Sequence, residues 1–296
     1  MIKCLRPIIG YRSKVKNKDT GKYPIVFSRH NAFTDMKYLL PCGKCELCQK
    51  RRALEMSKRA VHEAYLHKEN CFVTLTYDDE HLPSDANAYR EVQLFLMRLR
   101  KRGITFRYLC ATEKGTSGTH RIHHHICFFG FNPLQRRWRY VVKNFGKNPS
   151  YYIPLLTSIW GNGHVLVSPF SEKTAYYTCS YCLKKAYGVK NEFEKIRSSR
   201  RPALGYNYYR TYWKDLFRNI RNGVKTLVPK YYIRKLKEEM PLQYFIFYEL
   251  PLRRRGFRGN HRFVDPFDNA SFLCYPELCK IEALKTERAV LKRKDL

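Results

Sequence analysis

The sequence has 296 residues, and its 57 Lys and Arg residues against 25 Asp and Glu residues give a formal net charge of +32. Such an excess indicates a polyanionic partner, because charge self-repulsion would otherwise oppose folding. The 23 Tyr and 18 Phe residues favour single-stranded nucleic acid, whose bases stack on aromatic rings. A membrane protein is excluded, since no apolar run approaches the roughly 20 residues of a spanning helix. The N-terminus also lacks a hydrophobic signal core, so we expect a soluble, intracellular protein.

The eleven cysteines, an odd number, do not resemble the framework of a small disulfide-stapled domain, and we expect them to be reduced. Residues 1–41 are interpreted as loop-rich, because Pro and Gly interrupt them frequently. The next segment carries Cys42, Cys45 and Cys48 at a spacing that lets thiolates surround one ion. With Cys4 as a candidate fourth ligand, this pattern predicts a small structural zinc knuckle. Three reduced cysteines in a turn are the alternative.

The next part of the chain predicts alternating helices and strands. Residues 47–67 have the spacing of a basic amphipathic helix, and residues 71–77 have the composition of a strand. A further helix is predicted at residues 92–103, and strands are predicted at residues 106–111 and 123–129. This order predicts an α+β fold, in which a central antiparallel sheet has helices packed on it.

The strand at residues 123–129 begins with three histidines. Successive side chains of a strand alternate between its two faces, so His123 and His125 point the same way and His124 points the other way. A hairpin through Gly115 and Gly118 would bring Glu113 beside the pair. Two imidazoles and one carboxylate with open positions suit a catalytic divalent ion. A polar strand face or an adventitious metal site is the alternative reading.

Residues 132–152 are basic, aromatic and weakly periodic, and we interpret them as a DNA-facing insertion. A short helix at residues 153–160 and a strand at residues 163–168 follow, and the next helix is predicted to begin at Ser168 or Ser171. On that helix Tyr177 and Tyr181 are four residues apart and share a face, with Lys184 one turn further along. A tyrosine phenol attacks a phosphodiester once its proton is removed. An aromatic stripe that packs the helix on a sheet is the alternative.

The last third of the sequence predicts an amphipathic helix at residues 209–220 and a final strand at residues 243–249. Residues 251–258 and the helical tail from Pro276 are basic, and we interpret them as accessory DNA contacts. A disordered solubilising tail is the alternative for the residues beyond Arg253.

These motifs, in this order, resemble those of the HUH endonucleases that initiate rolling-circle replication. The resemblance is closer to the replication initiators of microviruses, particularly the gokushovirus branch. It covers most of residues 40–215, and the matching stretches are residues 41–48, 72–83, 121–125, 175–185 and 199–205. Two positions depart from the family pattern: His124 replaces an apolar residue between the two histidines, and Ser180 replaces a basic residue between the two tyrosines.

The resemblance implies that His123, His125 and Glu113 hold Mg²⁺ or Mn²⁺ and that Tyr177 or Tyr181 cleaves the viral origin, with Lys184 as the important cation. The protein would become linked to the 5′ phosphate and release a 3′ hydroxyl for a host DNA polymerase. The second tyrosine would then allow the displaced strand to be rejoined into a circle. A host helicase would separate the strands, and the protein would act in the cytoplasm of the bacterial host.

Three segments are expected from this reading. They are a Cys-rich N-terminal segment at residues 1–52, an endonuclease domain at residues 53–222 and a basic accessory region at residues 223–296. The main rival is a non-enzymatic, single-stranded nucleic-acid-binding or packaging protein with a zinc knuckle, which would explain the charge, the aromatic residues and the cysteines. A transposase or relaxase of the same chemistry would differ in its substrate only.

Overall fold

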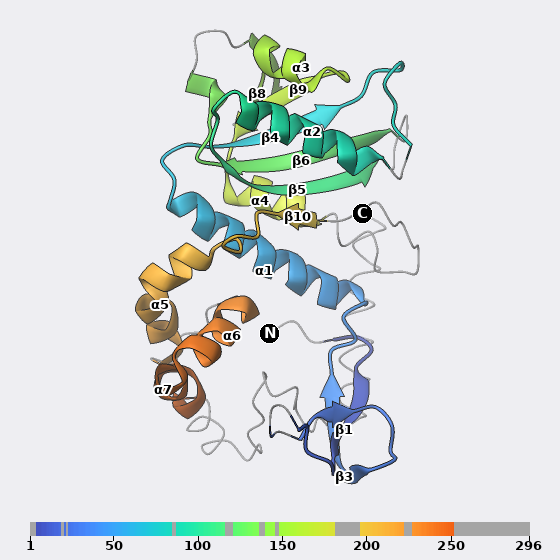
Figure 1. Ribbon diagram of the computed structural model, residues 1–296, viewed down its shortest axis with the longest axis vertical. Helices are drawn as coiled ribbons and strands as arrows, with labels where there is room; N and C mark the ends of the chain where they lie inside the picture. Colours follow the sequence, from blue (N-terminus) through green and yellow to red (C-terminus); the bar gives the residue numbers. More distant parts are fainter. Residues whose placement is uncertain are drawn as a thin grey trace. The chain divides into compact units, whose positions relative to one another are not determined.

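The computed structural model describes residues 4–18, 21, 23–84, 87–115, 121–135, 140–145, 148–180, 196–221 and 227–251 (Figure 1). The chain divides into two compact units. One unit contains residues 52–213, and the other combines residues 1–51 with residues 214–296. Within the described ranges no helix is both long enough and apolar enough to span a membrane.

The unit of residues 52–213 is built on a seven-stranded sheet in which all paired neighbours are antiparallel. The order of its strands is β10-β5-β6-β4-β9-β8-β7. The strands are β4 (Asn70–Thr76), β5 (Arg107–Lys114), β6 (Ile122–Phe129), β7 (Tyr140–Phe145), β8 (Asn148–Tyr152), β9 (Val165–Pro169) and β10 (Ile196–Ser198). The predicted α+β class with a central antiparallel sheet is confirmed.

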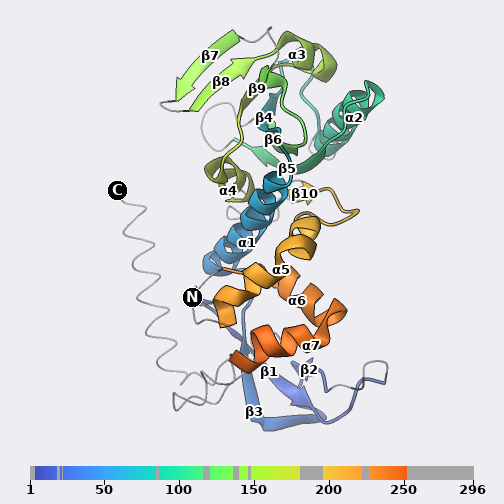
Figure 2. The same cartoon turned by 90° about the vertical axis from the view of Figure 1, so that its left-hand side faces the viewer.

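Helices cover both faces of this sheet (Figures 1 and 2). They are α1 (Glu46–Tyr65), α2 (Ala88–Lys101), α3 (Pro154–Trp160) and α4 (Glu172–Ser180). Alternating strand side chains build one apolar core on each face. Phe128 packs with α2 and α3 in the first core, whereas Phe72 and Phe129 pack with α1 and α4 in the second. The α4 face of the sheet therefore lies next to a helix that carries one of the predicted tyrosines.

Most of the elements predicted for this unit are present, including the two helices at its start, the strand at residues 70–76 and the β5–β6 hairpin. The helix after β9 begins at the second of its two predicted positions, because the Ser171 hydroxyl accepts a hydrogen bond of 3.1 Å from the Thr174 N–H. The α3 helix ends at Gly161, whose φ of 72° is left-handed.

Residues 132–152 are not the irregular insertion that the sequence suggested. They contain a short 3₁₀ helix (Pro133–Gln135) and the β7–β8 hairpin, which extends the sheet from β9. The register of this hairpin shifts between Val141 and Lys143. Such a shift interrupts the alternation of side chains, so the pattern of a strand is weak in the sequence.

The other unit begins with a three-stranded sheet in the order β2-β1-β3, and the prediction of a loop-rich N-terminal segment is therefore wrong. The strands are β1 (Ile8–Ser13), β2 (Ile25–Val26) and β3 (Ala32–Leu40). The register of β1 against β3 shifts between Tyr11 and Arg12. This irregularity removes the period of two that would have revealed a strand.

The second part of this unit is helical and contains the end of α5 (Tyr206–Arg221), α6 (Lys230–Glu239) and α7 (Pro241–Tyr244). Residues Phe245–Glu249 form a π-helical turn, so the strand predicted there is wrong. The aromatic residues of this segment favour a strand locally, but the Tyr244 and Tyr248 rings stack four residues apart, with centroids 5.5 Å apart. The basic region from Arg253 onward lies outside the described residues.

Candidate active site

The β5–β6 hairpin places Glu113 directly opposite His123 and Ala111 opposite His125. The Gly115 N–H donates to the Arg121 carbonyl at 3.0 Å, which continues the ladder beyond the last paired residues. On the other side of β6, His125 is opposite Thr74 of β4. Because strand side chains alternate, the three predicted ligands share the α4 face of the sheet with Thr74.

The ligand atoms of Glu113, His123 and His125 all lie within 4.8 Å of one another. One carboxylate oxygen of Glu113 is hydrogen-bonded to Nε2 of His123 and lies 3.4 Å from Nε2 of His125. Glu113 and His125 are buried, whereas the His123 side chain is 22% exposed, so the group is open to solvent on one side. Two imidazole nitrogens and one carboxylate oxygen are a donor set that a divalent cation accepts.

The other ring nitrogen of each of these histidines is also held. Nδ1 of His125 lies 3.2 Å from the Thr74 hydroxyl, and Nδ1 of His123 lies 3.2 Å from the Arg121 carbonyl. Partners of this kind fix the ring orientation and leave Nε2 directed at a common point. Thr74 was not singled out in the sequence, because its place beside His125 depends on a strand pairing between residues far apart in the chain.

His124 points into the opposite core. Its ring nitrogens lie 2.8 Å from the Tyr77 hydroxyl and 2.9 Å from the Thr112 hydroxyl. Burial, together with the neighbouring His123 and His125, lowers the pKa of His124 to about 3, so the ring is neutral. This histidine is a satisfied core residue, and the structure separates it from the other two.

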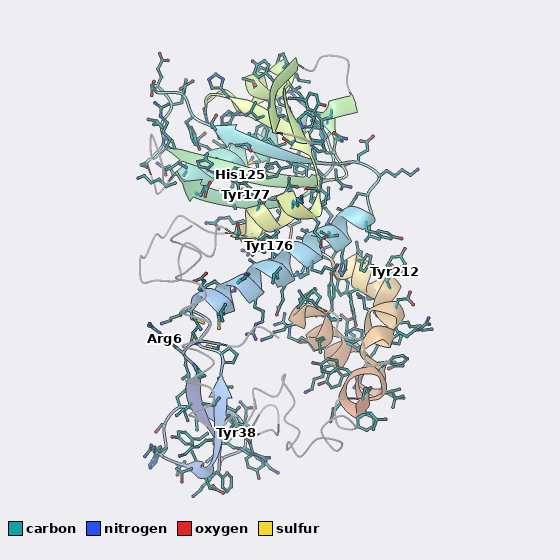
Figure 3. All side chains as sticks on the ribbon, turned by 180° about the vertical axis from the view of Figure 1, so that it is seen from behind. Arg6, Tyr38, His125, Tyr176, Tyr177 and Tyr212 are labelled. Atoms are coloured by element: carbon teal, nitrogen blue, oxygen red, sulfur yellow. The ribbon has the colours of Figure 1, made fainter. Side chains whose placement is uncertain are left out.

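Helix α4 brings Tyr177 to the same face of the sheet. Figure 3 shows Tyr177 beside His125, and the ring centroids of the two residues are 5.1 Å apart. The Tyr177 side chain is 47% exposed, which leaves room for a substrate. Its neighbour Tyr176 packs against the second core, and burial followed by the nearby Cys179 raises its pKa. Tyr181 and Lys184, the other predicted catalytic residues, lie outside the described residues.

The four predicted zinc ligands form a second group. The sulfur atoms of Cys4, Cys42, Cys45 and Cys48 lie within 4.8 Å of one another. All four are free cysteines. Burial alone would raise the pKa of Cys42, but hydrogen bonds from the backbone N–H groups of Cys45 and Lys44 outweigh it and lower the pKa to about 7.

The fold and the first group define an α+β protein with a candidate metal centre beside an exposed tyrosine. A family model for replication-associated proteins of the ORF2 type matches residues 70–186, which include Glu113, His123, His125 and Tyr177. The chain is 30% identical to replication-associated protein VP4 of Bdellovibrio phage phiMH2K over 256 residues, which cover 80% of this chain and 78% of that protein.

It is 31% identical over 276 residues to replication-associated protein ORF2 of Spiroplasma virus 4, covering 83% of each chain. Replication-associated protein ORF4 of Chlamydia phage 1 is 29% identical over 220 residues, which cover 68% of this chain and 55% of that protein. No solved structure matches the chain. The chain belongs to the family of microvirus-type replication-associated proteins.

Proposed function

We propose that the protein initiates rolling-circle replication of a microvirus as a metal-dependent tyrosine endonuclease of the HUH type. The observation that carries this proposal is the position of Tyr177, an exposed phenol 5.1 Å from the His125 ring in a group of one carboxylate and two imidazoles. The membership of the chain in a replication-associated family supports DNA as the substrate. The net charge of +32 suits this substrate as well.

In the proposed reaction Glu113, His123 and His125 hold Mg²⁺ or Mn²⁺. When bound, such an ion would polarise the scissile phosphate and stabilise the charge that develops on it. Thr74 and the Arg121 carbonyl keep the two imidazoles oriented, since each contacts the ring nitrogen that faces away from Glu113.

Tyr177 is the proposed nucleophile. Its phenol loses a proton to solvent, and its oxygen forms a bond to the phosphorus at the scissile position while the bond from phosphorus to the 3′ oxygen breaks. The 3′ oxygen takes up a proton and becomes the primer hydroxyl for a host polymerase. The new phosphotyrosine is itself a phosphodiester, so a later attack by a 3′ hydroxyl reverses the step and seals a circle without ATP.

Several parts of the proposal concern the chain beyond this site. Tyr181 would make the second cleavage, and Lys184 would stabilise the phosphate charge. The endonuclease domain would comprise residues 53–222, with the Cys-rich segment 1–52 and the basic region 223–296 as accessories. Unwinding would fall to a host helicase, and the protein would act in the cytoplasm of the bacterial host.

The decisive experiment incubates the protein with a labelled single-stranded circle of viral DNA and Mn²⁺. We expect a covalently labelled protein band that disappears with EDTA. The double variant Tyr177→Phe/Tyr181→Phe should lose the band, because it removes both nucleophiles. Tyr176→Phe is the matched control on the same helix and should keep it, since Tyr176 packs against the core.

Two outcomes would overturn the proposal. An adduct that persists in the double variant would exclude these tyrosines as nucleophiles. Tight, salt-sensitive binding without an adduct on any origin-containing substrate would instead favour a non-enzymatic, single-stranded nucleic-acid-binding protein.

A further inference from the structure

The cysteines that converge in the unit of residues 1–51 and 214–296 come from three separate places in its fold. Cys4 precedes β1, Cys42 follows β3, and Cys45 and Cys48 lie just before and within the first turn of α1. Sulfur atoms gather at this point, near the labelled Arg6 (Figure 3). From this convergence we propose that the protein binds one structural Zn²⁺ ion through these four thiolates, independently of the proposed nuclease site.

The distances between the sulfur atoms suit a tetrahedral ion. Four thiolates at a Zn–S distance of about 2.3 Å are separated from one another by about 3.8 Å. The Cys4 and Cys45 sulfur atoms lie 3.7 Å apart, and all four sulfur atoms lie within 4.8 Å of one another. A disulfide has an S–S length of about 2.0 Å, and these cysteines are free thiols.

The backbone around Cys42 is arranged to support thiolate charge. The N–H groups of Lys44 and Cys45 donate to the Cys42 sulfur at 3.4 and 3.2 Å, and the Cys42 N–H donates to the Cys4 sulfur at 3.3 Å. Gly43 permits this tight turn, because its φ of +70° is a conformation that other residues adopt at a cost. Hydrogen bonds from backbone N–H groups offset part of the negative charge that four thiolates bring to one ion.

The chemistry of the donors selects zinc and a structural role. Four soft sulfur ligands complete a tetrahedral shell and leave no position open for water or substrate. The group of Glu113, His123 and His125 differs in both respects, because it offers two nitrogens and one oxygen. Mg²⁺ and Mn²⁺ prefer oxygen ligands, so the two sites should not exchange their ions under ordinary conditions.

The ion would stabilise a part of the fold that has few other sources of stability. A sheet of three short strands buries little apolar area, and one of its strands has only two residues. Zn²⁺ would join the beginning of β1, the end of β3 and the beginning of α1, which ties the sheet to the helix. Metal binding then contributes directly to folding of this unit.

The test begins with the full-length protein purified in the presence of Zn²⁺ and dialysed against Mg²⁺. Elemental analysis should find one zinc ion per chain. Replacement by Co²⁺ should give the charge-transfer band of thiolate ligands and the visible spectrum of tetrahedral cobalt. Cys42→Ser/Cys45→Ser should lose both signals.

Two controls separate this site from the rest of the protein. Cys71→Ala, at a buried cysteine in the core of the other unit, should retain zinc and the cobalt spectrum. His123→Ala/His125→Ala should also retain both, whatever its effect on nicking. Because a cysteine variant can fail to fold, zinc is also removed from the wild-type chain with a mercurial reagent. Hydrogen exchange should then accelerate in β1 and β3 but not in β4 and β6.

Three results would overturn the proposal. They are the absence of stoichiometric zinc after reconstitution, retention of zinc by Cys42→Ser/Cys45→Ser, and iron instead of zinc in the purified protein. None of these results depends on whether the protein forms a DNA adduct, so zinc binding and nuclease activity can fail separately.

Discussion

The orientation of His125 depends on a single hydroxyl, that of Thr74, which lies 3.2 Å from its Nδ1. Thr74→Val keeps the shape of the side chain and removes this partner, so the ring loses its fixed tautomer and direction. We expect Mn²⁺ to bind about 10- to 100-fold more weakly, as is usual when the hydrogen-bond partner of a metal ligand is removed. Titration followed by the electron paramagnetic resonance of free Mn²⁺ measures this change.

Thr112→Val is the matched control, because Thr112 makes the corresponding contact to His124 on the other face of the sheet, at 2.9 Å. It should leave Mn²⁺ affinity unchanged and lower the free energy of unfolding by about 1–3 kcal/mol, since a buried ring nitrogen loses its partner. Equal effects of both substitutions on Mn²⁺ binding would contradict the assigned role of Thr74.

His62 makes the stability of the protein depend on pH. Its ring stacks on Tyr208 with centroids 4.1 Å apart and is only 6% exposed. Burial, followed by the charge of Lys58, lowers its pKa to about 4, below the unfolded value near 6.5. The folded protein therefore favours the neutral ring, and its contribution is complete above pH 6.5 and is lost as the pH falls toward 4.

The corresponding prediction compares urea unfolding at about pH 7.5 and pH 5 in the wild type and in His62→Phe. The variant keeps an aromatic ring on Tyr208 but cannot titrate. Its free energy of unfolding should fall by about 2 kcal/mol less than that of the wild type between these pH values. Other buried groups titrate in both proteins, so an identical fall in the two would show that His62 does not couple to folding.

At the scale of elements, the turn before β9 holds the end of β4 in place. The Asp78 N–H donates to the Asn162 carbonyl at 3.1 Å, and the Thr76 N–H donates to the His164 carbonyl at 3.0 Å. Gly163, between these acceptors, has a φ of +140°, and a Cβ atom there would lie 2.6 Å from the Asp78 nitrogen and the Thr76 oxygen. Backbone atoms cannot move aside as a flexible side chain can.

We therefore expect Gly163→Ala to lower the free energy of unfolding by about 3 kcal/mol. It should also weaken Mn²⁺ binding, because β4 carries Thr74. Gly103→Ala is the control, since Gly103 also has a positive φ, of +76°, but has no atom within 4 Å of the added Cβ. This control should cost only about 1–2 kcal/mol. Similar losses in urea denaturation for the two variants would show that the close approach at Gly163 is unimportant.

Regular elements were the ones that the sequence predicted. The spacing of apolar residues in α2 and the alternation in β6 reflect uninterrupted packing on one core, so they predict both the element and the direction of His123 and His125. Strands β1 and β7 were missed where register shifts break the alternation. The site was predicted as far as local geometry reaches, through the short hairpin from Glu113 to His123. Thr74 depends on long-range pairing of β4 with β6, which one sequence does not specify.

At the scale of the whole molecule, positive charge is distributed over both units. Residues 52–213 contain 26 Lys and Arg residues and 12 Asp and Glu residues, so +18 of the net +32 belongs to the other unit. The proposed cleavage site is therefore not on the more basic unit. Under the proposed function, we expect affinity for DNA to come largely from residues 1–51 and 214–296, and cleavage chemistry to come from residues 52–213.

The N-terminal sheet offers a direct test of this division. Arg12 and Lys14 are exposed, and within the described part of the chain neither has an ion-pair partner. Arg12 lies 4.9 Å from the centroid of the Tyr23 ring, and Lys14 lies 5.7 Å from that of Phe33, so the cations stand beside aromatic rings. This pairing of charge and stacking surface suits single-stranded DNA.

Arg12→Gln/Lys14→Gln should weaken binding of a single-stranded oligonucleotide and reduce the slope of log affinity against log salt by about 1.4, because two phosphate contacts are lost at about 0.7 each. The matched control is Arg234→Gln/Lys235→Gln on α6, where the Glu238 carboxylate lies 3.8 Å from Arg234 and 3.0 Å from Lys235 and already neutralises them in part. Its slope should change little. Adduct formation at saturating DNA should be the same in both variants, because Tyr177 lies in the other unit. If the first variant instead lost adduct formation at saturation with an unchanged salt slope, the N-terminal sheet would act in the chemistry and not in binding.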